Sequence, residues 1–196
     1  MSILIRPAGE ADVPDLAKLL MLATEGITEA IYHDLIPGKP TNEIVERRFH
    51  FKGTTKSFHC CHVAEQSGRV VGKLHAHPID AVLNDPPDPL VPDDRYAVVE
   101  VFDHLDVAAP DSYYINAIAV YPEHRGQGIG GALMAQAEEH ARQGGFTTLS
   151  LAVFEENEGA LRLYRRHGFE EVARHPAAKH PMLHLGGDIL MLLKAL

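Results

Sequence analysis

The amino-acid sequence predicts an α/β fold built on a mixed central sheet, and two observations lead to this prediction. Two apolar segments, residues 58–64 and 70–77, flank the turn sequence Gln66-Ser67-Gly68, which is typical of an antiparallel hairpin. Further along, a strand–turn–helix pattern followed by a second strand and helix occupies residues 113–169. Such a unit places its two strands parallel, with a right-handed crossover. The sheet is therefore expected to contain antiparallel and parallel pairs.

The N-terminal part of the chain is predicted to contain one strand and three helices. Residues 3–6 form the expected strand, and Asp12-Val13-Pro14 begins the first helix with an acidic cap and a proline in the first turn. Apolar residues at helical spacing continue that helix. Two shorter helices are expected over residues 27–35 and 42–49.

Residues 78–111 differ in composition from the rest of the chain. They hold repeated prolines and nine acidic residues, against Arg95 as the single lysine or arginine. We expect an insertion or a long connection within one domain, with at most one strand, at residues 97–102. Two interpretations of the acidic residues stay open: a solvated loop, or a surface that attracts a cationic ligand.

Regular elements return after this segment. The pattern predicts strands at residues 113–120, 147–154 and 188–194, and helices at 128–143 and 159–167. Glycines stand just past both helices, where a left-handed residue commonly ends a helix. The final strand is expected at an exposed sheet edge, which would permit pairing with a second copy, so a homodimer is one expectation.

Composition limits the classes of function. The 196 residues, taken as 1–196, suit a single domain, and they include no signal-peptide pattern and no apolar stretch of the roughly 20 residues that a membrane span needs. The net charge of −9 argues against nucleic acid or an anionic membrane as a partner. Cys60 and Cys61 are adjacent, which disfavours a disulfide between them, so a reducing cytoplasm is expected.

Thirteen histidines raise the question of a metal site. His75 and His77 would share one face of a strand, and His175, His180 and His184 fall in one late segment. None of them has a familiar zinc-binding spacing with the cysteines. We therefore expect solvated or core histidines and no metal.

The turn RGQGIGG at residues 125–131 has the features of a phosphate-binding loop. Its glycines let the backbone approach a ligand closely, successive N–H groups can point inward, and the following helix N-terminus carries positive partial charge. Arg125 adds a full positive charge. A pyrophosphate group is the ligand that we expect this turn to bind.

The same turn satisfies the dinucleotide-binding pattern GxGxxG through Gly126, Gly128 and Gly131. Two features count against that interpretation. The first glycine should follow the strand almost directly, yet residues 121–125 intervene. Only 65 residues follow Gly131, which is too few for the paired halves of a dinucleotide-binding fold.

Residues 119–130, AVYPEHRGQGIG, resemble the signature of GNAT acyltransferases, whose core [Q/R]-x-x-G-x-[G/A] matches Arg125, Gly128 and Gly130. A second family motif is similar to NEGALRLY at residues 157–164. The resemblance implies a mostly antiparallel central sheet flanked by helices, with one splayed parallel strand pair. It also implies an N-acetyltransferase, which moves an acyl group, most often acetyl, from coenzyme A to an amine.

The resemblance further implies where acetyl-CoA would bind. The pantetheine arm inserts like an extra strand beside the backbone of Ile118 and Val120, and backbone N–H groups across residues 127–130 hold the pyrophosphate. Asn157 would cap the last helix and lie near the arm. The implied cofactor-binding residues are Ile118, Ala119, Val120, Arg125, Gly126, Gln127, Gly128, Ile129, Gly130 and Asn157.

Tyr164 stands two helical turns after Asn157 and is the expected general acid. When the amine attacks the thioester, coenzyme A leaves as a thiolate. A thiol with a pKa of about 8.5 can take a proton from a phenol with a pKa of about 10 if the two are held together. The alternative is that Tyr164 is only an interior aromatic residue on an amphipathic helix.

The general base and the acceptor stay open. The strand at residues 113–120 has no acid, so Glu100, Asp103, His104 or water are the candidates for the base. The acceptor is expected to be a small-molecule or peptide amine. Neither cysteine lies in the matched motifs, so transfer should be direct, without a covalent enzyme intermediate. A non-catalytic acyl-CoA-binding sensor on the same fold is the alternative function.

Overall fold

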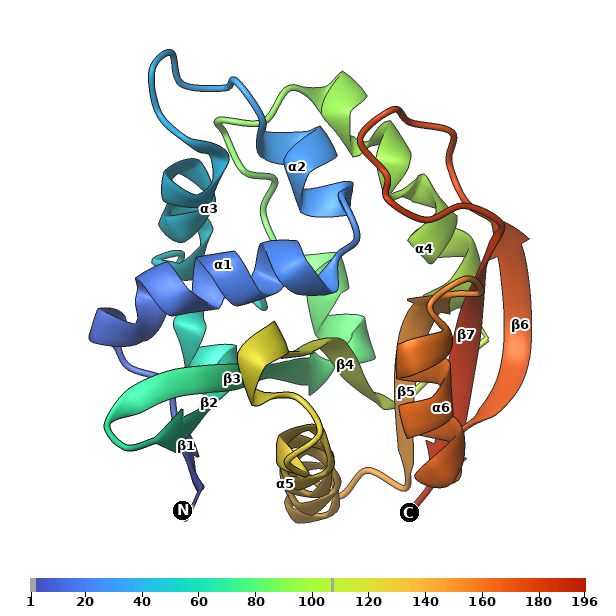
Figure 1. Cartoon of the computed structure of the whole chain (residues 1–196). Helices are drawn as coiled ribbons and strands as arrows, with labels where there is room; N and C mark the ends of the chain where they lie inside the picture. The colour runs from blue at the N-terminus through green and yellow to red at the C-terminus, as the bar shows by residue number, and fades with distance from the viewer. Residues whose placement is uncertain (1–2, 107) are drawn as a thin grey trace.

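The computed structural model describes residues 3–106 and 108–196. Seven strands in this part of the chain form one sheet. The strands are β1 (Leu4–Pro7), β2 (Cys61–Gln66), β3 (Arg69–Pro78), β4 (Tyr113–Val120), β5 (Thr148–Phe154), β6 (Glu170–Pro176) and β7 (Asp188–Ala195). Their order across the sheet is β1-β2-β3-β4-β5-β7-β6 (Figure 1). Only β4 and β5 are parallel among these neighbours, so the mixed, mostly antiparallel sheet is confirmed.

Helices cover both faces of this sheet. They are α1 (Val13–Ala23), α2 (Ile27–Tyr32), α3 (Thr41–Phe49), α4 (Glu100–Asp106), α5 (Ile129–Gln143) and α6 (Glu158–Arg166). Helix α1 packs on α3 and on strands β3 and β4, whereas α5 contacts the same two strands from the other side (Figure 1). The βαβα unit predicted for residues 113–169 is confirmed as β4–α5–β5–α6.

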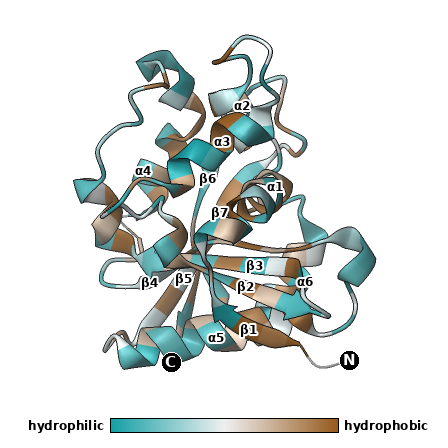
Figure 2. Cartoon of the chain, turned by 90° about the vertical axis from the view of Figure 1, so that its left-hand side faces the viewer, coloured by the Kyte–Doolittle hydropathy of each residue, from teal (hydrophilic) through white to brown (hydrophobic). Residues whose placement is uncertain are grey.

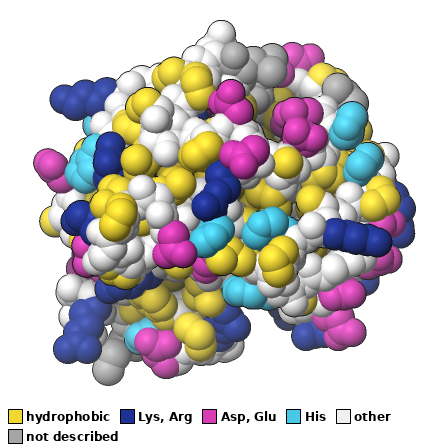
Figure 3. Space-filling view, turned by 90° about the horizontal axis from the view of Figure 1, so that it is seen from above, with side chains coloured by type: hydrophobic (Ala, Val, Ile, Leu, Met, Phe, Trp, Pro, Cys, Tyr) yellow, Lys and Arg dark blue, Asp and Glu magenta, His cyan; other side chains and the backbone are white. Residues whose placement is uncertain are grey.

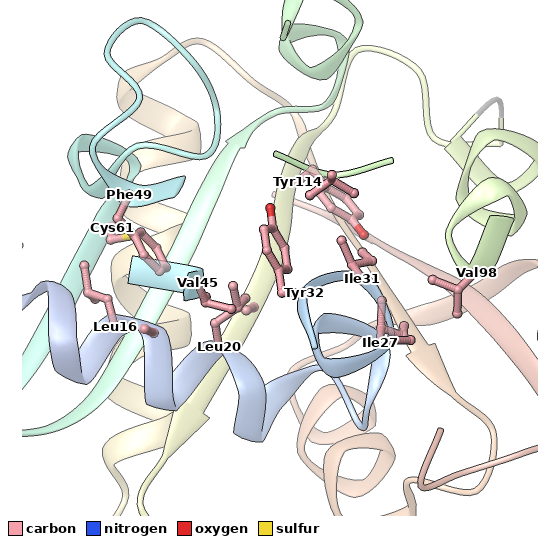
Figure 4. Close-up of a cluster of buried hydrophobic side chains, with 14 of the residues drawn as sticks. Leu16, Leu20, Ile27, Ile31, Tyr32, Val45, Phe49, Cys61, Val98 and Tyr114 are labelled. Atoms are coloured by element: carbon pink, nitrogen blue, oxygen red, sulfur yellow. The ribbon is translucent and has the colours of Figure 1, made fainter. Parts of the chain in front are cut away.

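Each face of the sheet has its own hydrophobic core. On the α1 face, Leu16, Leu20 and Phe49 belong to one buried cluster with Tyr114 of β4 (Figure 4). On the α5 face, a second cluster includes Leu133 together with Leu161 and Tyr164 of α6. Figure 2 shows hydrophobic residues concentrated in the strands, while much of α5 is hydrophilic on its outer side. The sheet is thus buried on both faces around β4 and β5.

The predicted hairpin is confirmed, with a shift at its start. Ser67 and Gly68 have φ values of 53° and 75°, which are the positive φ angles of a two-residue type I′ turn between β2 and β3. Residues 58–60, expected as strand, form a short 3-10 helix instead. The Ser57 side chain accepts a hydrogen bond from the backbone N–H of His59 and so caps this turn. The strand therefore begins only at Cys61.

The strand expected at residues 97–102 is wrong. A 3-10 helix spans Asp93–Val98, and α4 follows it. Val101 and Leu105 are both buried and stand four residues apart, a spacing that puts both on one face of a helix. The apolar residues of this segment thus follow a helical period, and the long connection contributes a helix to the α1 face.

The expected place of the final strand is also wrong. Strand β7 lies between β5 and β6, so it is not a sheet edge. The edge on that side of the sheet is β6, a strand that the sequence pattern did not predict. Glu170, Glu171 and Arg174 of β6 are not buried. Charged residues on an edge strand obscure the alternation of apolar and polar residues that marks a strand, and they discourage pairing with another chain.

Lys73 of β3 is completely buried beneath α1. Its Nζ donates a hydrogen bond to the Leu16 carbonyl at 3.2 Å and lies 5.0 Å from the centroid of the Phe49 ring. Among the described residues, no carboxylate forms an ion pair with it. Burial lowers the pKa of Lys73 to about 7. The unfolded chain therefore binds one more proton than the folded chain between that pKa and the ordinary lysine pKa of about 10.4.

We predict that Lys73→Met stabilises the fold at pH 7. The gain is at most about 4 kcal/mol, because each unit of pKa depression corresponds to about 1.4 kcal/mol. The stability of the original chain should rise as pH increases from 7 to 10, and this slope should be weaker in the variant. Urea unfolding at several pH values measures both. An equal slope in the two proteins would contradict the prediction.

Candidate active site

The two parallel strands separate soon after they meet. Strands β4 and β5 pair only at Tyr113↔Leu149 and Tyr114↔Ser150. The register between β4 and β3 shifts at the same level, because His75 faces Ala117 whereas Ala76 faces Ile115. Asn116 is therefore the extra residue of a β-bulge, which bends a strand and increases its twist. Beyond the bulge, the side of β4 that faces β5 has no strand partner among the described residues.

A cavity of about 1080 Å³ lies where these strands diverge. Its wall includes Ile118, Ala119 and Val120 from β4, Ala152 and Val153 from β5, and residues of α1, α4, α6 and the turn before α5. The cavity therefore joins the C-terminal half of β4 to both helical layers. A ligand in it can reach the unpaired backbone groups of β4.

The glycine turn forms one end of this cavity. Gly126 and Gly128 have φ values of 75° and 81°, in the left-handed region where glycine is favoured. Gly128 is the N-cap of α5 and has no side chain to occupy the first N–H groups of that helix. These N–H groups and the helix dipole can bind an anion. Arg125 also lines the cavity, with its Nε donating to the Val120 carbonyl at 3.2 Å.

The structure brings together all but one of the implied cofactor-binding residues. The exception is Gln127, which does not line the cavity; its Oε1 accepts a hydrogen bond from Gln66 at 3.4 Å. Those that line it are Ile118, Ala119, Val120, Arg125, Gly126, Gly128, Ile129, Gly130 and Asn157. They come from β4, the turn and the start of α6, so the cavity is continuous from the strand gap to the glycine turn.

Asn157 and Tyr164 both lie on the cavity wall, as their spacing predicts. The Asn157 Oδ1 accepts a hydrogen bond from the Ala160 N–H at 3.1 Å, which makes it the N-cap of α6. Its Nδ2 donates to Glu25 Oε1, also at 3.1 Å. Tyr164 is buried, and its burial raises the pKa of the phenol to about 12. The phenol therefore stays protonated at neutral pH, although it gives up its proton less readily than an ordinary tyrosine.

The three side chains named as candidate bases have different positions. Glu100 is exposed and does not line the cavity. His104 is stacked on His175, with ring centroids 4.9 Å apart, and is likewise outside it. Asp103 lines the cavity.

Two further carboxylates line the cavity: Glu25, which sequence reasoning missed, and Asp106, which it counted only among the acids of residues 78–111. Asp106 has one buried carboxylate oxygen without a hydrogen-bond partner. Its pKa is raised to about 6, mainly because the carboxyl is buried and secondly because the negative charge of Asp103 is near. The signal for Asp106 was present: Val99, Phe102, Asp103 and Asp106 follow a helical spacing, and all four line the cavity. A strand expectation for residues 97–102 obscured it. No sequence pattern marks Glu25.

The nine acids of residues 78–111 fall into three groups: two that hold the connection in place, two that line the cavity, and five that are exposed and outside it. Asp85 accepts hydrogen bonds from the backbone N–H and the hydroxyl of Thr55. Asp88 is buried and accepts from the Leu90 N–H and the Tyr32 hydroxyl. These two residues hold the connection in place. Asp103 and Asp106 face the cavity from α4.

The histidines expected to share a face do so, and both are buried. The rings of His75 and His77 are 5.6 Å apart, and burial lowers the pKa of each. Within residues 3–106 and 108–196, no group of three His, Cys, Asp or Glu side chains is arranged to hold a metal ion. No helix in this part of the chain is long and apolar enough to span a membrane.

Known proteins share both the motif region and the fold. The family model described as Acetyltransferase (GNAT) family matches residues 28–169, more than half of the chain. An uncharacterized N-acetyltransferase of Methanocaldococcus jannaschii is 47% identical over 57 residues, which are 29% of this chain and 25% of that relative. The chain thus matches only a quarter of that relative's length.

Solved structures resemble the whole chain. The crystal structure of an acetyltransferase has a TM-score of 0.71 at 21% identity and covers 98% of both chains. A Drosophila melanogaster polyamine N-acetyltransferase, which forms N-acetylagmatine, has a TM-score of 0.65 at 17% identity over the full length of both chains. These two show the likeness of the fold. Together with the family match over the motif region, they establish that the chain belongs to the GNAT acetyltransferase family.

Proposed function

We propose that the chain transfers an acetyl group from acetyl-CoA directly to an amine, and that residues 1–196 act as one catalytic domain. The observation that carries this proposal is a single cavity lined by the unpaired edge of β4, the glycine turn and Tyr164. Family membership supports the same activity. A sensor without catalysis would need the strand gap and the turn, but it would not need a tyrosine at the gap.

The cofactor would lie along the gap between β4 and β5. Its pantetheine amides would pair with backbone groups of Ile118 and Val120 on the side of β4 that faces the gap, where the Val120 carbonyl now accepts a hydrogen bond from Arg125 Nε. Its pyrophosphate would meet the N–H groups at the start of α5 and the Arg125 guanidinium. Gln127 would contribute only its backbone, because its side chain is directed to Gln66.

Tyr164 would protonate the departing thiolate. It lines the cavity from α6, in the helix that Asn157 caps. With a pKa of about 12, the phenol is fully protonated when the reaction begins. The sulfur becomes basic only as the C–S bond breaks, so Tyr164 would first donate a hydrogen bond to the developing charge and then pass its proton to the poorly solvated thiolate.

The acceptor would be an amine with a second positive charge. Three carboxylates line the cavity, Glu25, Asp103 and Asp106, beside three guanidiniums: Arg48, Arg125 in the glycine turn, and Arg166 at the end of α6. Acidic, basic and histidine side chains are interspersed on the face seen in Figure 3, so attraction of a cation would arise from the cavity and not from a broad surface field. The polyamine N-acetyltransferase with the same fold makes such an acceptor reasonable.

Cofactor binding and acetyl transfer can be tested one after the other. Acetyl-CoA and coenzyme A should raise the melting temperature by about 2–4 °C at 100 times their Kd, whereas NADH should not, because such binding stabilises the fold by about 2.7 kcal/mol. A panel of monoamines, diamines and polyamines should then release free thiol from acetyl-CoA. Absence of thiol release with every amine, in a sample that binds acetyl-CoA, would favour the sensor.

Tyr164→Phe should keep the acetyl-CoA thermal shift and lower kcat by about 100-fold, the usual contribution of a positioned acid. The matched control is Tyr113→Phe, since Tyr113 is a half-buried tyrosine of β4 outside the cavity. Its hydroxyl donates to the Ala76 carbonyl at 3.4 Å. Equal activity of both variants would remove Tyr164 as the acid and leave the fold assignment intact.

A further prediction concerns acceptor charge. The ratio of kcat/KM for a diamine to that for a monoamine of equal length should fall several-fold in Asp103→Asn and in Asp106→Asn. In the original chain the same ratio should fall as pH decreases through about 6, because Asp106 then becomes protonated and neutral. Added salt should lower the ratio as well. If this ratio of kcat/KM values does not change with pH, with salt or in either variant, the two acids do not contact the acceptor.

A further inference from the structure

Glu25 stands in the turn between α1 and α2 in an unusual backbone conformation. Its φ is 48°, in the left-handed region that residues with a Cβ seldom adopt, and Gly26 follows with a φ of 93°. Such a conformation persists only where the surroundings enforce it, and it occurs often at functional sites. The residue also lines the cavity that holds the proposed acceptor.

The loop before β7 enforces this conformation. A Cβ added to Gly26 would lie 1.9 Å from the Met182 carbonyl oxygen, so only glycine lets the two segments approach this closely. Next to this contact, the His184 N–H donates a hydrogen bond to the Glu25 carbonyl at 2.9 Å. The turn is therefore locked between the N-terminal helices and the loop that precedes β7.

The carboxylate of Glu25 is held as well as its backbone. Oε1 accepts the hydrogen bond from Asn157 Nδ2 at 3.1 Å, and Oε2 lies 3.9 Å from His184 Nδ1. The other end of the Asn157 amide caps α6, the helix that carries Tyr164. One amide thus ties the Glu25 carboxylate to the scaffold of the proposed general acid.

We propose that Glu25 is the general base of the transfer and that Asn157 and His184 are its positioning residues; this inference rests on the proposed function. The Glu25 carboxylate takes one proton from the acceptor ammonium, and the neutral nitrogen attacks the thioester carbonyl. A C–N bond forms and the C–S bond breaks. The nitrogen loses its second proton as the amide forms, the thiolate gains one by way of Tyr164, and the remaining proton leaves to solvent.

Asp106 is the competing carboxylate in the same cavity, and its surroundings differ. One of its oxygens is buried without a partner, and no hydrogen bond from α6 reaches it among the described residues. Its neighbour is Asp103, so the two acids together suit the retention of a distant positive charge. Glu25 instead contacts Asn157, a residue of the proposed cofactor site, and the reacting nitrogen must arrive beside the cofactor.

The deciding experiment is the pH profile of kcat/KM from pH 6 to 10 for the original chain and Glu25→Gln, with the best acceptor of the amine panel. We expect about a 100-fold loss in Glu25→Gln near pH 7, which shrinks as pH approaches the pKa of the acceptor, because a free amine needs no base. Glu25→Asp should recover part of the loss. Glu43→Gln, an exposed acid on α3 outside the cavity, is the matched control and should behave like the original chain.

A second variant separates positioning from structure. Asn157→Ser keeps a good cap for α6 but removes the donor to Glu25, so kcat should fall about ten-fold while the melting temperature changes little. Its loss should show the same recovery at high pH as Glu25→Gln. A pH-independent loss would assign Asn157 to the cofactor alone.

The outcomes distinguish this inference from the function beneath it. If the original chain transfers no acetyl group, both proposals are wrong. If the original chain is active and Glu25→Gln retains its rate and pH profile, only the role of Glu25 is overturned. A pH-dependent loss in Asp106→Asn that is missing in Glu25→Gln would transfer the role of base to α4. Acetyl-CoA should stabilise every variant, which shows that each is folded.

Discussion

The separation of β4 from β5 is the constraint on which the rest of the structure depends. The two strands share only two residue pairs, and the bulge at Asn116 turns β4 away just beyond them. Open backbone groups are costly inside a protein, so such a gap persists only if both faces of the sheet hold it open. Here α1 supports β3 and β4 from one face and α5 supports them from the other. The cavity is the direct result.

The two helices that begin at the cavity provide its chemical groups in different ways. Helix α5 begins after glycine and leaves its first N–H groups for a ligand. Helix α6 begins at Asn157, whose side chain satisfies the helix and also contacts Glu25. An N-cap that uses only one end of its amide for the helix has the other end free to organise a neighbouring segment. The first terminus is therefore open to an anion, whereas the second, in the mechanism proposed above, positions the general base.

Buried polar groups are numerous on the α1 face. Lys73, His75 and His77 lie along β3 with little access to water, and burial lowers the pKa of each. His75 Nε2 lies 2.6 Å from the Thr55 carbonyl, while its Nδ1 has no partner in the part of the chain described. None of these three side chains lines the cavity, so they do not pair with the carboxylates on its wall.

Local sequence determined the elements whose signals lie within a few residues. The type I′ turn at Ser67-Gly68, the glycine turn after β4 and the cap at Asn157 follow from short-range sterics and hydrogen bonding, and all three were predictable. Only the tertiary structure decided which distant groups meet. Strand β6 depends on its pairing with β7, helix α4 on its packing against β6 and β7, and the Glu25 turn on Asn157 and the loop before β7. A periodic pattern records which face of an element is buried, but it does not record what that face is buried against.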